Sequence, residues 1–298
     1  MRVLVTGAAG FLGQYVCFAL EQVGHEVIRL DKIPPMPRNA RHPADVVASI
    51  TEPLPVVDIL NSDAVIHLAA MASPSFCDRN PGEAFKVNVQ GTYNVLKLAL
   101  ESGAKKFVFS SSAHVYGISP KYLPTDETHP LQLLNTYTTT KILGEQLCQL
   151  FYENHGLSYT VLRLYNAYGP GQGPGYFIPD QIEKARIGNF TLQGGNITKD
   201  WVYVDDVADA FVRAVESAFV GPVNVGTGIE TSLADIGRMI GTAYRVPFDA
   251  YVGANPTRML CDNQRAKSVL GWVPKVSLEE GLDRTIKAYE KRPVLQKS

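Results

Sequence analysis

The chain has 298 residues, of which 45% are hydrophobic and 19% charged, and its net charge is −1. These values fit one large α/β domain with a smaller lobe and exclude a general electrostatic attraction to nucleic acid or an anionic membrane. No apolar run approaches the roughly 18 residues of a membrane span. A strand pattern opens the chain without a leader, and four scattered cysteines lack metal-ligand spacing, so we predict a reduced, cytoplasmic protein without a metal.

An apolar run opens into a glycine turn close to the amino terminus. It reads Val3-Leu4-Val5-Thr6-Gly7-Ala8-Ala9-Gly10-Phe11-Leu12-Gly13, and a helix-compatible segment follows to about Val23. A strand, a glycine turn and a helix N-terminus form an anion site, because backbone N–H groups and the helix dipole favour a phosphate there. Glycines at these positions permit the turn, the approach of phosphates and the packing of the helix. We predict a dinucleotide site rather than a purely structural turn.

Acidic residues end the next two strand patterns. Asp31 closes the strand pattern of residues 26–31 and lies 18 residues after Gly13, close to the spacing of a carboxylate that bonds the adenosine ribose. A carboxylate there repels the 2′-phosphate of NADP and favours NAD, although the neighbouring Lys32 weakens this preference. Asp45 and Val46 end a second, shorter pattern, where they either hold the adenine or form an ordinary strand end.

A third buried-strand pattern covers residues 63–70 and ends in Leu68, Ala69 and Ala70. Small side chains at the carboxyl end of a parallel strand leave room for a cofactor. His67, inside this strand, is predicted to be a buried core histidine rather than a catalyst.

Strand and helix patterns then alternate along the chain. Helices are expected over 83–101 and 136–154, and strands over 106–110 and 159–164. Such alternation predicts an α/β fold with a doubly wound parallel sheet of the Rossmann type, whose ligands bind at the carboxyl ends of the strands.

A glycine- and proline-rich stretch from Tyr168 to Gly175 marks the passage into a second lobe. We therefore expect a cofactor-binding domain over residues 1–167 and a smaller substrate lobe over 168–298, some segments of which return to the first domain. Within this lobe, residues 198–206 read as a strand running into a helix, with Asp205 and Asp206 as candidate caps.

Three polar groups converge on the ligand edge of the predicted sheet. Ser110, Ser111 and Ser112 follow a strand, and Tyr137 and Lys141 lie one helical turn apart on one face. A tyrosine is a poor base at neutral pH, but a nearby ammonium and a cationic nicotinamide would lower its pKa. Tyr137 would then remove a proton from a substrate alcohol that Ser112 holds. Tyr-x-x-x-Lys alone arises often by chance, and its combination with the serines and the glycine turn favours this chemistry.

In combination, these motifs resemble those of the extended short-chain dehydrogenases/reductases of the NAD-dependent epimerase/dehydratase group, which modify nucleotide sugars. The resemblance covers nearly the whole chain and rests on residues 6–13, 67–70, 88–92, 110–117, 137–141, 163–170, 199–206 and 270–272. It implies Ser112, Tyr137 and Lys141 as the catalytic residues. The expected contacts to NAD are Gly7, Gly10, Phe11, Leu12, Gly13, Asp31, Asp45, Val46, Leu68, Ala69, Ala70, Asn88, Ser110, Tyr137 and Lys141.

The resemblance also implies a set of contacts to the substrate. Asn166 would bind the pyrophosphate, and Phe177 and Gln193 would lie near the nucleotide base. The family usually has Arg where this chain has Lys199, which keeps the charge but loses the bidentate grip on a phosphate. Arg258 is then the expected phosphate clamp, or else an ordinary surface arginine.

The two residues that follow Ser112 separate reactions within the family. In its dehydratases and decarboxylases this pair supplies a carboxylate, whereas here it is Ala113-His114. A 4,6-dehydratase is therefore disfavoured, and His114 acts either as an acid or as a shape-determining residue of the sugar pocket.

We predict a 4-epimerase of a UDP-hexose or UDP-uronate with tightly bound NAD. An NAD(P)-dependent reductase of a nucleotide-bound 4-keto-6-deoxy sugar is the alternative. A protein that senses dinucleotide without turnover is a third hypothesis, which the Tyr137/Lys141 pair disfavours. The resemblance further implies a homodimer through the helices at 83–101 and 136–154.

Overall fold

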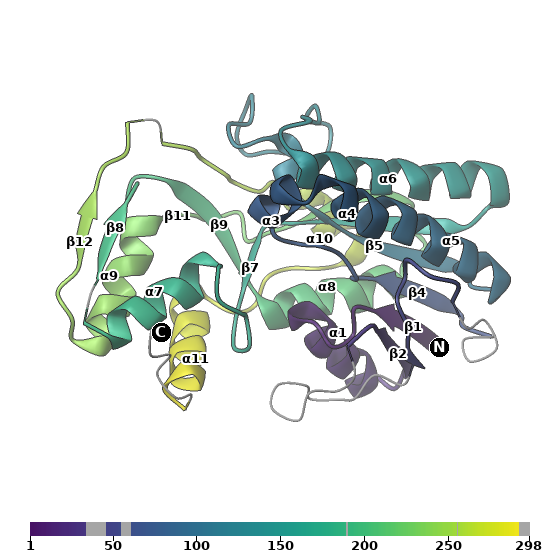
Figure 1. Cartoon of the computed structure of the whole chain (residues 1–298), viewed down its shortest axis with the longest axis horizontal. Helices are drawn as coiled ribbons and strands as arrows, with labels where there is room; N and C mark the ends of the chain where they lie inside the picture. Colours follow the sequence, from purple (N-terminus) through teal and green to yellow (C-terminus); the bar gives the residue numbers. More distant parts are fainter. Residues whose placement is uncertain (34–45, 55–60, 189, 255, 292–298) are drawn as a thin grey trace.

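Seven parallel strands form the central sheet of this computed structural model, which describes residues 1–33, 46–54, 61–188, 190–254 and 256–291 (Figure 1). Their spatial order is β10-β6-β5-β4-β1-β2-β3. The strands are β1 Arg2–Thr6, β2 Glu26–Asp31, β3 Val46–Val47, β4 Ala64–His67, β5 Lys106–Ser112, β6 Ser158–Leu164 and β10 Gly221–Val225. The predicted doubly wound parallel sheet is confirmed.

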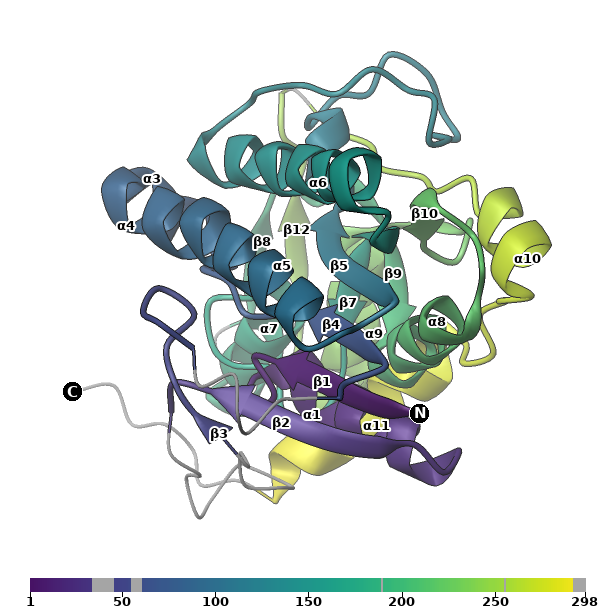
Figure 2. The same cartoon turned by 90° about the vertical axis from the view of Figure 1, so that its right-hand side faces the viewer.

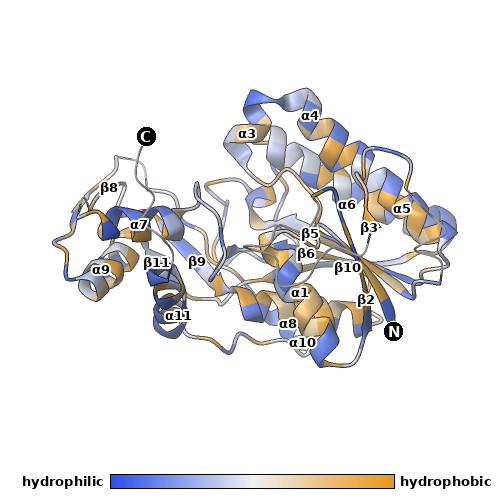
Figure 3. Cartoon of the chain, turned by 60° about the horizontal axis from the view of Figure 1, so that its bottom comes forward, coloured by the Kyte–Doolittle hydropathy of each residue, from blue (hydrophilic) through white to orange (hydrophobic). Residues whose placement is uncertain are grey.

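Helices cover both faces of this sheet (Figure 2). On one side lie α5 and α6, and on the other α1 and α8 pack against each other. Alternation along β1 explains the two layers, because Val3 and Val5 enter the hydrophobic cluster of α1 and α8 whereas Leu4 enters the cluster of α5 and α6. Much of α1 and α8 carries the hydrophobic colour in Figure 3.

The helices of this half follow the predicted patterns with one difference. The residues predicted as a helix over 83–101 belong to three consecutive pieces, in which a π-helical turn at Lys86–Gln90 separates α4 from α5. The helix predicted over 136–154 is α6, and Gly156 ends it in the left-handed conformation. The bounds are α1 Phe11–Gln22, α3 Pro74–Arg79, α4 Pro81–Phe85, α5 Gly91–Glu101, α6 Thr136–His155, α8 Val204–Glu216 and α10 Gln264–Leu270, with a short 3₁₀ turn η2 at Ala113–Tyr116.

A second lobe is built on two small sheets, which lie to the left in Figure 1. In one, β9 pairs with β7 in parallel and with β11 in antiparallel orientation, and in the other β8 pairs with β12. The elements are β7 Asn166–Tyr168, β8 Thr191–Gln193, β9 Thr198–Tyr203, β11 Glu230–Ser232 and β12 Asp249–Tyr251, with α7 Phe177–Arg186, α9 Leu233–Tyr244 and α11 Leu278–Glu290.

The chain crosses between the two halves more than once after residue 168. Although β10 and α8 follow the first lobe elements in sequence, β10 pairs with β6 and α8 packs on α1. The later α10 packs on β10, so the lobe is assembled from separated stretches of the chain.

Two local predictions differ from the structure. Ser110–Ser112 do not follow the strand but form its last three residues, since β5 pairs with β6 as far as Ser112 and Leu164. Neither Asp205 nor Asp206 caps α8, because its N-cap is Tyr203 and no side chain accepts a bond there. Asp206 instead accepts from the backbone N–H groups of Lys275 and Val276.

Candidate active site

Glycine is required at the turn that follows β1. Gly7 has a φ of +72°, and a Cβ atom there would lie 2.7 Å from the backbone nitrogen of Ala69. A Cβ on Gly13 would lie 2.1 Å from the carbonyl oxygen of Gly7. Gly10 is the N-cap of α1. The turn is thus packed so closely against its neighbours that it has no room for side chains at Gly7 and Gly13. A ligand at this turn would therefore meet backbone atoms.

Replacing Gly13 with alanine is expected to push α1 away from the turn. Overpacking of this kind costs about 1–3 kcal/mol of the free energy of unfolding, and the displaced helix N-terminus should retain less nicotinamide dinucleotide. Urea denaturation and the dinucleotide content of the purified protein measure both effects. Gly82→Ala is the matched control, because nothing lies within 4 Å of its added Cβ. Equal stability of the two variants would contradict the packing argument.

Asp31 braces the glycine turn as well as ending β2. Its carboxylate accepts hydrogen bonds from the backbone N–H of Ala9 at 2.9 Å and of Ile33 at 3.1 Å. The side chain is 8% exposed. This carboxylate therefore lies at the turn where a ribose hydroxyl would be held, and its position is set by the turn itself.

A cavity of about 240 Å³ opens at this edge of the sheet. Six of the predicted cofactor contacts line it, namely Gly7, Gly10, Asp31, Leu68, Ala69 and Ala70. Residues outside that predicted set also line it, among them Lys32, Ile33, Ala48, Ser49, Ile50, Thr51, Met71, Glu83 and Val87. The loop after β3 contributes four of these, and no local motif marks it.

The other predicted cofactor contacts that the structure describes are not among the residues that line this cavity. Val46 is 9% exposed and packs in the core beside Leu30, and Asp45 lies outside the described residues. Phe11 and Leu12 occupy the first turn of α1 and pack on the core that α1 shares with α8.

Asn88 joins the cavity wall to the helix that carries the catalytic pair. Its amide accepts from the backbone N–H of Met71 at 2.8 Å and donates to the hydroxyl of Thr140 at 3.0 Å. The residue is 2% exposed and sits in the π-helical turn. Its observed contacts hold the loop after β4 against α6.

His67 is the buried core histidine that the sequence predicts. Its ring lies between the hydroxyls of Thr6 at 2.7 Å and Thr92 at 3.1 Å and is 2% exposed. Burial, aided by the charge of Lys141, lowers its pKa from 6.5 to about 3. The neutral ring connects β1 to α5 beneath the cavity.

This shift predicts a pH-dependent stability. The unfolded chain takes up a proton on His67 near pH 6.5 and the folded chain only near pH 3, so its contribution is complete above pH 6.5 and is lost as the pH falls toward 3. The slope is about 1.4 kcal/mol per pH unit. Urea denaturation between about pH 7 and 5 measures it, and His67→Gln should show a shallower slope than the wild type. Equal slopes would show that His67 is not the group that titrates.

Ser112, Tyr137 and Lys141 meet at the ends of β5 and α6. Asn135 begins α6 with a capping box to Thr138, which sets the first turn of the helix around Tyr137. The side chain of Ser112 acts on that of Tyr137, whose pKa it lowers. Lys141 Nζ donates to the carbonyl oxygen of Ser110 at 2.8 Å and lies 5.8 Å from the centre of the Tyr137 ring. The predicted trio is thus assembled, and Tyr137 and Lys141 are 7% and 5% exposed.

Burial sets the acidity of this pair. It raises the pKa of Tyr137, and the side chain of Ser112 only partly offsets this. It also lowers the pKa of Lys141 to about 8, while Cys77 and Glu145 act in the opposite direction. In the protein alone, burial therefore dominates the pKa of Tyr137. That an ammonium together with a cationic nicotinamide lowers this pKa stays a prediction.

Residues of both halves face each other across the site. His114 lies in η2 directly after Ser112, and its backbone N–H donates to the Ser112 hydroxyl at 3.2 Å. Burial and then the charge of Lys199 lower the pKa of His114 to about 4. The His114 ring is therefore neutral at physiological pH, so it is not a general acid there. Lys199, from β9, is half-buried, and burial lowers its own pKa.

The other predicted substrate contacts are distributed over the lobe. Asn166 is half-buried and donates to the carbonyl oxygen of Asp200 at 2.9 Å. Phe177 begins α7 with its ring 5.6 Å from that of Trp201, and Gln193 is exposed at the end of β8. Arg258 is exposed and paired with Glu230 at 2.5 Å, so the proposed phosphate clamp already has a carboxylate partner, which the sequence did not indicate.

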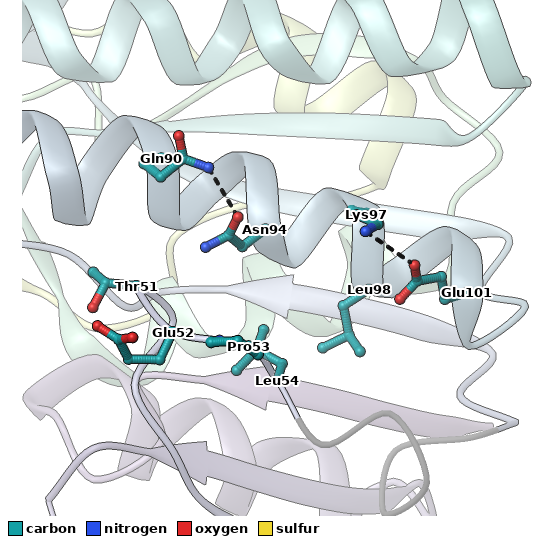
Figure 4. A pocket seen from close by; sticks show the side chains of 9 residues that line it. All are labelled: Thr51, Glu52, Pro53, Leu54, Gln90, Asn94, Lys97, Leu98 and Glu101. Atoms are coloured by element: carbon teal, nitrogen blue, oxygen red, sulfur yellow. Dashed lines mark hydrogen bonds and ion pairs between the residues drawn. The ribbon is translucent and has the colours of Figure 1, made fainter.

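A larger cavity of about 480 Å³ lies away from these groups, between residues 51–54 and α5 (Figure 4). Its polar side chains bond to one another, since Gln90 donates to Asn94 at 3.0 Å and Lys97 pairs with Glu101 at 3.5 Å. None of the predicted catalytic, cofactor or substrate residues lines it.

Two features, a metal-binding group and a membrane-spanning helix, are absent from the described residues. No group of three or more His, Cys, Asp or Glu side chains there is arranged to hold a metal ion. Over the same residues, no helix is long and apolar enough to cross a membrane.

The glycine turn after β1 and the serine, tyrosine and lysine at the ends of β5 and α6 define a short-chain dehydrogenase/reductase. Residues 3–226 match the model of the NAD dependent epimerase/dehydratase family, and the chain belongs to this family of NAD-dependent enzymes.

Individual relatives cover almost the whole chain. It is 34% identical to a UDP-glucose 4-epimerase of Mycolicibacterium smegmatis over 98% of this chain and 99% of that protein. It is 32% identical to UDP-glucuronic acid decarboxylase 1 of Xenopus tropicalis over 97% of this chain and 72% of the relative. A crystal structure of the Thermotoga maritima UDP-glucose 4-epimerase with UDP-glucose superimposes with a TM-score of 0.90 at 33% identity, covering 98% and 99% of the two chains.

Proposed function

We propose that this protein is a nucleotide-sugar 4-epimerase that acts on a UDP-hexose or a UDP-uronate with tightly bound NAD. The observation that carries the proposal is the placement of Ser112 and Lys141 around Tyr137, next to a residue pair, Ala113-His114, that offers no carboxylate. The similarity to UDP-glucose 4-epimerases supports it.

The glycine turn and its surroundings fit a dinucleotide. Their backbone N–H groups and the α1 N-terminus suit a pyrophosphate, and the carboxylate of Asp31 suits a ribose hydroxyl. NAD, when bound, accepts a hydride from the sugar carbon and can return it.

The chain's own residues control the proton and the position of the sugar. Ser112 holds the C4 oxygen, and Tyr137 removes its proton as the carbon is oxidised and gives one back when the 4-keto sugar is reduced. Lys141, held by the carbonyl of Ser110, keeps a positive group next to the Tyr137 ring. Rotation of the 4-keto sugar between the two steps inverts C4.

The substrate is proposed to bind between the two halves. Asn166, Lys199 and Arg258 would contact its diphosphate, and Phe177 and Gln193 its base. The neutral ring of His114 would shape the sugar end of the pocket.

A direct test is to denature the purified protein and quantify the released cofactor. We expect about one NAD per chain, and conversion of UDP-glucose to UDP-galactose, or of UDP-glucuronate to its C4 epimer, without added cofactor. Protein that is free of dinucleotide and inactive on both UDP-sugars would refute the proposal.

A keto-sugar reductase remains the second candidate, because Lys32 lies on the cavity wall beside Asp31 and suits a 2′-phosphate. It would use Ser112, Tyr137 and Lys141 once per turnover and exchange its cofactor. Tighter binding of NADPH than of NADH by cofactor-free protein would favour it.

We also propose a homodimer through α5 and α6. Both helices carry exposed large apolar side chains, with Tyr93 44% and Leu150 47% exposed. Light scattering on the eluting protein measures the mass directly, and a monomer would refute this part.

A further inference from the structure

Asp200, in the middle of β9, is a fully buried carboxylate outside the catalytic trio. Its exposed fraction is 0%. One oxygen accepts from the backbone N–H and from the hydroxyl of Thr227, both at 2.7 Å, and the other accepts from the backbone N–H of Gly228 at 2.8 Å and of Cys261 at 3.2 Å. Among the described residues its partners are thus all neutral donors, and they compensate the cost of burying the charge.

These bonds join parts of the chain that are far apart in sequence. Asp200 belongs to the lobe, whereas Thr227 and Gly228 directly follow β10 of the central sheet. Cys261 lies in a third segment, which bridges to Thr125. A single side chain therefore connects β9 to two segments at the boundary between the halves.

The three groups proposed to contact the diphosphate, Asn166, Lys199 and Arg258, are each connected to Asp200 or to its strand partner. The carbonyl of Asp200 accepts from Asn166 at 2.9 Å. Lys199 precedes Asp200, and because successive strand residues point to opposite faces, burying the carboxylate directs Lys199 the other way, where its charge acts on His114.

The third group, Arg258, is held through the neighbouring strand. Glu230 lies directly opposite Asp200 in the β9–β11 register and pairs with Arg258 at 2.5 Å. The placement of Arg258 thus also depends on where β9 sits.

We propose that Asp200 is a positioning residue for the nucleotide-sugar substrate: by pinning β9 to residues 227–228 and 261 it sets the positions of Asn166, Lys199 and Arg258. The inference rests on the proposed function, which supplies the ligand. The carboxylate of Asp200 bonds to Thr227, Gly228 and Cys261 and to no member of the catalytic trio, and so it governs binding rather than the chemical step.

Asp200→Asn is the sharpest variant, because it preserves volume but turns one acceptor into a donor that faces N–H groups. We expect KM for the UDP-sugar, and Kd for UDP measured by calorimetry, to rise about tenfold. Saturated kcat and the content of NAD should change much less, since Ser112, Tyr137, Lys141 and the glycine turn lie elsewhere.

Two further variants separate positioning from general stability. Asp206→Asn is the matched control, because Asp206, in the first turn of α8, is 2% exposed and accepts from two backbone N–H groups at 3.1 and 3.0 Å. It should lower the melting temperature without raising Kd for UDP. Thr227→Val removes the hydroxyl that bonds to Asp200 and to the backbone of Ile229 but keeps the backbone N–H bond to Asp200. It should fold normally and raise Kd about two- to threefold.

The outcomes distinguish the two proposals. Wild-type protein that binds UDP but epimerises no sugar would refute the proposed reaction and leave the Kd comparison as the test of Asp200. Equal Kd for UDP in the wild type, Asp200→Asn and Thr227→Val would refute the positioning role. A parallel loss of kcat, NAD content and UDP affinity in Asp200→Asn and Asp206→Asn would also overturn it, because that pattern indicates a general structural role.

Discussion

Replacing Tyr137 with phenylalanine is expected to lower kcat for the nucleotide sugar by about 10²–10⁴-fold. The variant keeps the buried ring and loses only the hydroxyl, on which Ser112 acts. Without that oxygen, the proton of the C4 hydroxyl has no acceptor when the hydride leaves, whereas the cavity around the glycine turn is unchanged. NAD content should therefore match that of the wild type. Turnover at saturating UDP-sugar, together with the dinucleotide released on denaturation, measures both quantities.

Tyr152→Phe is the control for this change. Tyr152 lies on the same helix but is 42% exposed, and its ring packs near that of Tyr159. Its loss of a hydroxyl should leave kcat unchanged. If Tyr137→Phe retained the wild-type turnover, the assignment of the proton-transfer step would be wrong.

Glu145→Gln is expected to destabilise the fold by about 3–5 kcal/mol, the cost of leaving one member of a buried ion pair without its partner. Glu145 and Arg163 are 9% and 5% exposed in their side chains and approach to 2.6 Å. The guanidinium also bonds to Tyr116, and Ser111 donates to Glu145. This pair ties α6 to β5 and β6 one turn beyond Lys141, so its loss should also disturb the catalytic helix.

The matched control is an exposed pair of similar geometry. Asp283 and Lys287 lie 2.6 Å apart with side chains 57% and 68% exposed, and Asp283→Asn should cost less than about 0.5 kcal/mol. Glu145→Gln combined with Arg163→Met should recover part of the loss, because no unpaired charge then remains buried. Urea denaturation of the four proteins measures these differences. Equal costs for the buried and the exposed substitution would contradict the argument.

Most of the central fold could be predicted from local patterns. Strand and helix periods marked β4, β6 and α6 to within a few residues, and the glycine turn identified the ligand edge. The predicted strand stops at Ser110 because Ser has no strand preference, whereas pairing with Leu162–Leu164 of β6 extends β5 through Ser112.

The candidate site was predictable where its residues share one motif. Tyr137 and Lys141 are one turn apart, and the strand–turn–helix geometry places Gly7, Gly10 and Asp31 together. By contrast, the loop after β3 and the pairing of Arg258 with Glu230 bring together residues that no short-range pattern connects.

The sequence by itself determined the fold class, the glycine turn and the candidate trio of serine, tyrosine and lysine, because each depends on the spacing of residues within one or two elements. Only the tertiary structure decided that β10 and α8 return to the first half, that Glu145 meets Arg163, and that Asp200 joins three segments. The tertiary structure also decided that Tyr137 is buried deeply enough to raise its pKa. These outcomes depend on which distant residues shield a group from water and on which polar groups bond to a buried charge. Both are set by the packing of the whole chain.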